Sequence, residues 1–179
     1  MVKGDNETMK DMKIREETST DFKGVWELNA AAFETEVEAN LVNLLRESGI
    51  SYISLVAEQN EKMIGHILFT PVVLEGDNSG IKLAGLAPMA VIPNLQKLGI
   101  GSRLVAEGIK HCKSMGFDAI VVLGHPEYYP RFGFVPSVNY NIVSEYDVPD
   151  EAFMILELNK GCLKGKQGKI KYHKAFSNV

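Results

Sequence analysis

Residues 86–105 read LAPMAVIPNLQKLGIGSRLV, and this stretch decides the fold. A nearly apolar segment enters a short loop, and the loop carries Gly99 and Gly101 into residues with apolar groups at helical spacing. The pattern predicts a strand over residues 81–92 and a helix over residues 99–115. The sequence therefore places a glycine-containing loop between a strand end and a helix start.

A loop of this kind can bind an anion with its own backbone. The first turn of a helix has amide groups without intrahelical partners, and the helix dipole places partial positive charge at that end. Glycine at positions 99 and 101 leaves these amides accessible, and Lys97, Ser102 and Arg103 can add donors. We expect a phosphate or pyrophosphate ligand. A dinucleotide-binding G-x-G-x-x-G fingerprint is incomplete because Leu104 occupies the third glycine position, and no P-loop motif occurs.

The remaining segments predict a mixed α/β chain. Apolar spacing and turn residues predict two helices ahead of the loop, over residues 19–33 and 36–47. Strands are expected over residues 12–16, 52–58, 62–74, 119–123 and 153–158, with a final β-like segment near residue 172. A loop rich in Gly, Pro and Tyr is expected over residues 124–136. This order favours an α/β or α+β domain.

Composition restricts the class of protein. The 179 residues include 19 basic and 23 acidic side chains, so a net charge of −4 argues against a nucleic-acid binder. Residues 11–179 are expected to form a single domain after a flexible tail over residues 1–10. No apolar run is long enough to cross a membrane, and Cys112 and Cys162 show no disulfide or metal-ligand pattern. A cytoplasmic protein without a bound metal is the expectation.

Two motifs carry a family resemblance. The pattern Gln96-x-x-Gly99-x-Gly101 after Val91-x-Pro93 resembles motif A of the GNAT superfamily of N-acetyltransferases. Residues 121–134, VVLGHPEYYPRFGF, resemble its motif B, which implies a short helix from Tyr129 after the strand. With AAFETEVEANLVNLLRES, PDEAFMILEL and the terminal Tyr172 to Phe176, the likeness extends over about residues 12–176 and is greatest to the bacterial YhbS-like branch.

The resemblance implies the GNAT fold, with a mostly antiparallel mixed sheet in which two neighbouring strands splay apart. It also implies that acetyl-CoA is the cosubstrate. Its pyrophosphate is expected on the loop and its pantetheine arm along the preceding strand, where Gly85 and Pro88 predict a local irregularity. The implied coenzyme-binding residues are Met89, Ala90, Val91, Gln96, Lys97, Leu98, Gly99, Ile100, Gly101, Ser102 and Arg103.

The motif match also implies that Tyr129 protonates the departing thiolate. A phenol is protonated at neutral pH and can donate. Packing beside Phe132 and Phe134 is the alternative reading of this tyrosine, and Tyr128 is a second candidate for the acid.

The general base is not identified. Acceptor-side candidates are Glu38, which best matches the branch, and His125, which follows a strand end. Glu34, Glu36 and Glu75 are further options. A solvated helix carboxylate is the alternative for Glu38, and a loop histidine that bonds to backbone is the alternative for His125.

The predicted function is acetyl-CoA-dependent transfer of an acetyl group to an amine. The acceptor is a small molecule or an amino group of a peptide or protein. Two alternatives stay open: a non-catalytic CoA-binding module, and an acyltransferase that uses a longer acyl group or a hydroxyl acceptor. Neither a nucleic acid nor a membrane is expected as partner, and a homodimer is possible because paired subunits are common in such enzymes.

Overall fold

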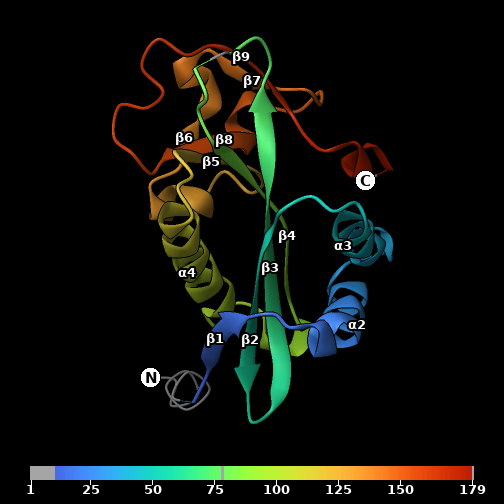
Figure 1. Cartoon of the computed structure of the whole chain (residues 1–179). Coiled ribbons are helices and arrows are strands. Elements are labelled where there is room, and N and C mark those ends of the chain that lie inside the picture. Colours follow the sequence, from blue (N-terminus) through green and yellow to red (C-terminus); the bar gives the residue numbers. More distant parts are fainter. Residues whose placement is uncertain (1–10, 78, 179) are drawn as a thin grey trace, which may run out of the picture. The chain divides into compact units, whose positions relative to one another are not determined.

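The computed structural model describes residues 11–77 and 79–178. Its strands are β1 (Lys13–Glu16), β2 (Ile53–Gln59), β3 (Lys62–Leu74), β4 (Leu83–Val91), β5 (Ala119–Leu123), β6 (Val135–Pro136), β7 (Ile142–Ser144), β8 (Phe153–Glu157) and β9 (Gly168–Lys171). Its α-helices are α2 (Phe22–Ala32), α3 (Val37–Glu47) and α4 (Ile100–Ser114), and six short 3₁₀ turns complete the described secondary structure (Figure 1). The predicted flexible tail lies outside the described residues.

The strands form a mixed sheet in the order β1-β2-β3-β4-β5-β8-β6, and β9 pairs with both β3 and β7. Most of the pairings with a known register are antiparallel; the parallel ones are β4 with β5 and β7 with β9. This mixed, mostly antiparallel sheet with helices confirms the predicted fold class.

Internal contacts divide the chain into two compact units. The first contains Met1–Leu68, Pro88–Gly108 and Asn178–Val179, and the second contains Phe69–Ala87 and Ile109–Ser177. Strands β3 and β4 and helix α4 each run from one unit into the other. The single domain expected from chain length stays a prediction.

In the first unit, the two faces of β3 contact different helices. His66 of β3 bonds to Asn29 of α2, whereas a side chain at the adjacent Gly65 would lie 2.8 Å from Leu104 of α4. Figure 1 shows α2 and α3 together on one side of this part of β3. Their buried apolar residues, with those of β2, make the core: Val25, Leu28, Ala39, Leu41, Val42, Leu45, Leu55, Val56 and Ala57.

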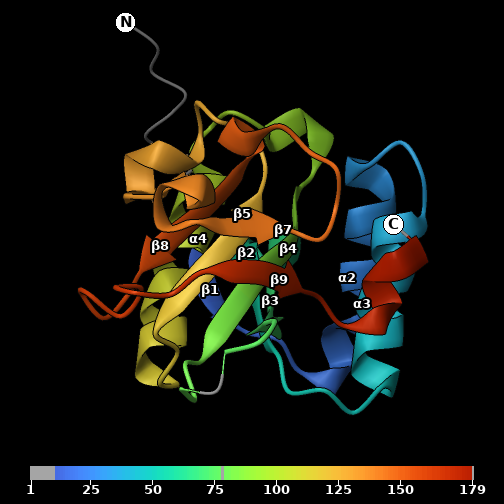
Figure 2. The same ribbon diagram turned by 90° about the horizontal axis from the view of Figure 1, so that it is seen from above.

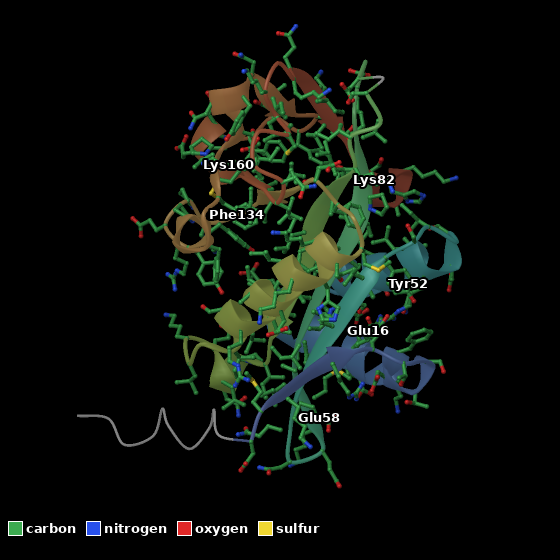
Figure 3. The ribbon with its side chains drawn as sticks, turned by 60° about the vertical axis from the view of Figure 1, so that its left-hand side comes forward. Glu16, Tyr52, Glu58, Lys82, Phe134 and Lys160 are labelled. Carbon is green, nitrogen blue, oxygen red and sulfur yellow. The ribbon has the colours of Figure 1, made fainter. Side chains whose placement is uncertain are left out.

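The start of α2 is held by side-chain bonds to β1 and β2 rather than by a side-chain cap. Asp21 occupies the N-cap position, but no side-chain capping bond to the helix forms. The Asp21 carboxylate instead accepts bonds from Thr18 N (2.7 Å) and from the Arg15 guanidinium (2.7 and 2.9 Å). Arg15 also reaches Glu58 at 2.8 Å, and Figure 3 labels Glu58 on β2. These bonds connect the start of α2 to β1 and β2.

In the second unit, β5 is central: it pairs in parallel with β4 and antiparallel with β8 (Figure 2). The apolar core beneath these strands contains Val72, Leu83, Val121, Ile155 and Ile170, among others. Gly85 of β4 allows a close approach here, because an added Cβ would lie 2.9 Å from Tyr172 Cε1. The absence of a side chain at position 85 therefore lets the Tyr172 ring pack on β4.

The segment after β5 departs from the prediction of a short helix. It forms a single 3₁₀ turn over Tyr129–Phe132, which ends at Gly133 with φ of 94°. The left-handed conformation of Gly133 prevents the turn from extending into an α-helix. Strands β6 and β7, which the sequence pattern does not indicate, follow it.

Candidate functional site

Strand β4 is longer than the ladder that joins it to β5. The parallel pairing runs from Leu83 opposite Ala119 to Leu86 opposite Val122. Strand β4 then continues to Val91, whereas β5 ends at Leu123. The last part of β4 thus carries backbone groups that a ligand can pair with as an added strand. Met89 and Val91 are partly exposed there, and Ala90 between them is buried.

The loop after β4 has an unusual backbone. A 3₁₀ turn over Pro93–Leu95 leads to Lys97 with φ of 64° and Gly99 with φ of 90°. Left-handed backbone at Lys97 is unfavourable for a side chain that is not glycine. Gln96 ties the loop to the strand, because its Nε2 donates to the Val91 carbonyl at 3.1 Å. The family resemblance implies that Gln96 and Val91 bind the coenzyme, and motif spacing gives no sign of this bond between them.

Helix α4 begins directly after Gly99. Arg103 N donates to the Gly99 carbonyl at 3.1 Å, so the amides of Ile100 and Gly101 precede the helical bonding pattern. These amides and the helix dipole suit an anion. The Arg103 guanidinium bonds to the Met12 carbonyl at 3.4 Å, which links α4 to the residue before β1. Residues 96 to 103 all belong to the first unit, so the structure brings the predicted loop residues together.

Tyr129 belongs to the second unit. Its side chain is only 6% exposed, and its ring packs edge-on against Phe134 (5.6 Å) and Tyr128 (5.0 Å). Phe134 is labelled in Figure 3. A Cβ at Gly124 would lie 2.4 Å from Tyr129 Cε2, so the ring lies directly against the backbone after β5. Burial, and then the neighbouring Tyr128, raise the pKa of Tyr129, which keeps its hydroxyl protonated.

The acceptor-side candidates differ in their surroundings. Glu38, in the first turn of α3, is partly buried, and its Oε2 is a buried atom without a hydrogen-bond partner in the described structure. His125 is exposed after β5, and its carbonyl accepts a bond from Tyr128 N at 3.0 Å. Glu34, Glu36 and Glu75 are exposed. Among these four glutamates, Glu38 alone has a buried oxygen without a hydrogen-bond partner in the described structure.

The first unit contains a buried polar network of Asn29, His66 and Ser54 that the sequence does not predict. Asn29 Nδ2 donates to the Val25 carbonyl (2.8 Å) and to His66 Nδ1 (3.1 Å), and His66 Nε2 lies 2.9 Å from Ser54 Oγ. Burial, and then the charge of Arg46, lower the pKa of His66 to about 3. The polar residues stand singly in apolar segments, so sequence spacing gives no signal for the network.

In residues 11–77 and 79–178, no group of His, Cys, Asp and Glu side chains is arranged to hold a metal ion. No helix there is long and apolar enough to cross a membrane.

Known proteins resemble this chain over most of its length. Residues 13–136 match the family model of the acetyltransferase (GNAT) domain. The uncharacterized N-acetyltransferase YhbS of Escherichia coli (strain K12) is 34% identical over 167 residues, which cover 93% of this chain and 99% of YhbS.

Two solved structures are similar as well. The crystal structure of Escherichia coli YhbS in complex with CoA has a TM-score of 0.88 and 33% identity, covering 93% of this chain and 92% of that one. A GNAT family acetyltransferase from Brucella melitensis in complex with acetyl-CoA has a TM-score of 0.75 and 32% identity, covering 92% and 97%. The family model, the identity and the fold agree, and this chain belongs to the GNAT family of N-acetyltransferases.

Proposed function

We propose that this protein transfers the acetyl group of acetyl-CoA to an amine, by direct attack of the amine on the thioester. The carrying observation is that β4 extends beyond its ladder with β5 and leads into a left-handed loop at the start of α4. The exposed edge of β4 can pair with the amide groups of the pantetheine arm. The backbone amides at the start of α4 can bind the pyrophosphate. The chain's similarity to relatives solved with CoA and acetyl-CoA supports the proposal.

The proposed coenzyme contacts follow from this path. The amides of residues 97 to 101 donate hydrogen bonds to the pyrophosphate oxygens, and the Ser102 hydroxyl and the cations Lys97 and Arg103 add further donors. Backbone groups of Met89 and Ala90 pair with the pantetheine arm. The Val91 carbonyl already accepts the Gln96 side chain, so Gln96 positions the loop in this proposal and its side chain does not bind phosphate.

In the proposed reaction, the neutral amine nitrogen forms a bond to the thioester carbon while the carbon–sulfur bond breaks. A backbone amide in Met89–Val91 stabilises the oxyanion of the tetrahedral intermediate. The Tyr129 hydroxyl gives its proton to the leaving thiolate and regains one from solvent. The amine loses its proton to water or to a carboxylate. Burial raises the pKa of Tyr129, so the phenol is protonated over the neutral pH range and has a proton to give.

The test is thiol release from acetyl-CoA in the presence of a panel of amines, followed by mass spectrometry of the acceptor. Amine-dependent thiol release with an added acetyl group on nitrogen is the expected result. Binding of CoA without release for any amine contradicts the enzyme proposal and favours a non-catalytic CoA-binding module. Faster release from a longer acyl-CoA at equal concentration assigns a different donor.

A further inference from the structure

The path beside the last part of β4 has a closed end. Strands β4 and β5 stay paired up to Leu86 opposite Val122, and β4 continues beyond this pair. In the proposed reaction, the pyrophosphate of the donor lies at the start of α4, and its pantetheine arm runs back along β4. The acyl group is the terminal part of the donor, so it comes last on this path and points toward the paired part of the two strands.

The two faces of the sheet are filled in different ways at this closed end. Leu86 and Val122 are cross-strand neighbours whose side chains share one face, and both are buried. The opposite face carries Gly85 next to Val121. Val121 is fully buried there, whereas Gly85 has no side chain. Strand β4 itself therefore leaves space on the face of Gly85.

The ring of Tyr172 occupies the space that Gly85 leaves. An added Cβ at Gly85 would lie 2.9 Å from Tyr172 Cε1 and 2.8 Å from Val72 Cγ1, closer than real Cβ atoms approach. Gly85 precedes Met89 by four residues, which is about 13 Å along an extended strand. A thioester bound beside Met89 would therefore keep an acetyl group clear of the ring, whereas a longer acyl chain extends toward it.

The Tyr172 ring is held in this position from several sides. Its centroid lies 5.8 Å from that of Tyr146 and 5.1 Å from that of Phe176. The backbone amide of Tyr172 donates to Glu145 Oε1 at 2.6 Å. Burial first, and then Tyr146 and Glu145, raise the pKa of Tyr172, so its phenol is uncharged at neutral pH. An acyl chain would have to displace an uncharged ring that its neighbours fix.

We propose that Tyr172 is a specificity-determining residue that restricts the donor to short acyl groups, because its ring closes the acyl end of the coenzyme path at Gly85. This inference rests on the proposed acetyl transfer and assigns the residue that selects its donor. Each further methylene would have to enter space that Tyr172 already fills, and overfilling a packed apolar site is unfavourable. The proposal favours acetyl-CoA over the longer acyl donors that the sequence leaves open.

The experiment compares Tyr172→Ala with Tyr146→Ala. Each variant loses one ring of the same aromatic pair, and of the two rings Tyr172 supplies the atoms nearest to Gly85. Values of kcat/KM for acetyl-CoA and hexanoyl-CoA are measured with one amine that the wild-type protein acetylates. We expect the wild-type protein to prefer acetyl-CoA at least about 100-fold, and Tyr172→Ala to reduce this preference at least about tenfold. Tyr146→Ala should keep the wild-type preference within about threefold.

The ratio of the two kcat/KM values separates donor selection from a structural role. A general loss of stability lowers both values together and leaves their ratio unchanged. Tyr172→Phe retains the ring and should keep the wild-type ratio, whereas Tyr172→Leu, a milder change than Tyr172→Ala, should shift it in the same direction. A wild-type ratio in either folded variant without the ring overturns the proposal. Equal use of hexanoyl-CoA and acetyl-CoA by the wild-type protein overturns it without any variant.

Failure of the proposed function gives a different result. If the wild-type protein binds CoA but releases no thiol with any amine, the acetyl-transfer proposal fails, and Tyr172 is tested by calorimetric binding alone. The wild-type protein should then bind hexanoyl-CoA at least about tenfold more weakly than acetyl-CoA, and Tyr172→Ala should bind the two about equally. Equal Kd values in the wild-type protein overturn the assignment of Tyr172.

Discussion

Tyr129 combines packing with a chemical role that its environment permits. Gly124, Tyr128 and Phe134 surround the ring, so the position of the hydroxyl is set by contacts at the ring edges. From the sequence, packing and proton donation are alternative roles for Tyr129. The two are compatible, because the same burial that packs the ring also raises its pKa.

Replacement of Tyr129 by Phe tests the proton-donor role. The aromatic contacts remain, so we expect kcat for thiol release to fall about 10²- to 10⁴-fold while the Kd for CoA changes less than about threefold. Tyr128→Phe is the control, since it removes a hydroxyl from the adjacent ring, and it should retain kcat within about threefold. Equal rates for Tyr129→Phe and the wild-type protein would reject the acid assignment.

His66 is a second residue with a strongly perturbed environment. The Asn29 amide nitrogen bonds to the Val25 carbonyl, which fixes its orientation and makes it the donor to His66 Nδ1. The neutral ring therefore carries its proton on Nε2, toward Ser54. Protonation of Nδ1 would place two donors face to face in a buried site, and this explains why the network favours the neutral ring.

The low pKa of His66 predicts acid sensitivity. The unfolded chain binds a proton near pH 6.5, whereas the folded chain binds it near pH 3, so the free energy of unfolding falls as pH decreases between these values. The slope approaches about 1.4 kcal/mol per pH unit at its steepest. Urea unfolding at pH 7.5, 5.5 and 4.5 measures this dependence of the free energy of unfolding on pH.

The control for this prediction is His125→Gln, which alters an exposed ring and should keep the wild-type slope. His66→Gln should be less stable at pH 7.5 but flatter between pH 6.5 and 4.5. If that variant does not fold, the ring proton signals of His66 in the wild-type protein decide the question by NMR. A titration midpoint above pH 5 would contradict the buried neutral state.

At the scale of elements, the loop between β4 and α4 shows how one bond can shape a binding surface. The Gln96 side chain returns to Val91, and the chain that follows Gln96 passes through left-handed conformations at Lys97 and Gly99. The loop is thus closed on the strand from which it leaves. We expect this closure to orient the amides before a ligand binds, which lowers the entropic cost of binding.

Gly99→Ala tests the loop against a matched glycine. Gly99 has φ of 90°, and Gly49, after α3, has φ of 74° with no neighbouring atom within 4 Å of an added Cβ. Both substitutions should destabilise the fold by about 1–2 kcal/mol because of left-handed strain. Only Gly99→Ala should also weaken CoA binding, by about tenfold in calorimetric titration. Equal CoA affinity in the two variants would reject the loop assignment.

The elements differ in how far sequence could predict them. Strands β3 and β5 match the predicted ranges at both ends, because continuous apolar runs are bounded by turn residues. Strand β7 is three residues long, and its parallel partner β9 begins 26 residues later in the chain, at Gly168. Local propensity cannot indicate such a distant pairing. The loop after β4 is continuous in sequence, so motif spacing predicted it. The burial of Glu38 Oε2 depends on the packing of α3, which local sequence does not show.

At the scale of the whole molecule, the strands and the helix that run through both units affect how cooperatively the protein unfolds. The two compact units share β3, β4 and α4, so neither unit is a separate stretch of chain. Loss of structure in one unit would leave these elements half paired, which costs hydrogen bonds and apolar burial. We therefore expect the units to unfold together, as predicted for a single domain.

Calorimetric unfolding with and without CoA tests this expectation. The wild-type protein should show one transition with equal calorimetric and van't Hoff enthalpies. Because the proposed CoA path follows β4, CoA at 100 times its Kd should move the whole transition upward by about 5–10 °C, from a stabilisation of about 2.7 kcal/mol. Two transitions, of which CoA shifts only one, would show that the shared elements do not couple the units. No shift at saturating CoA would remove the basis of the proposed function, since the strand edge and the loop would then have no ligand.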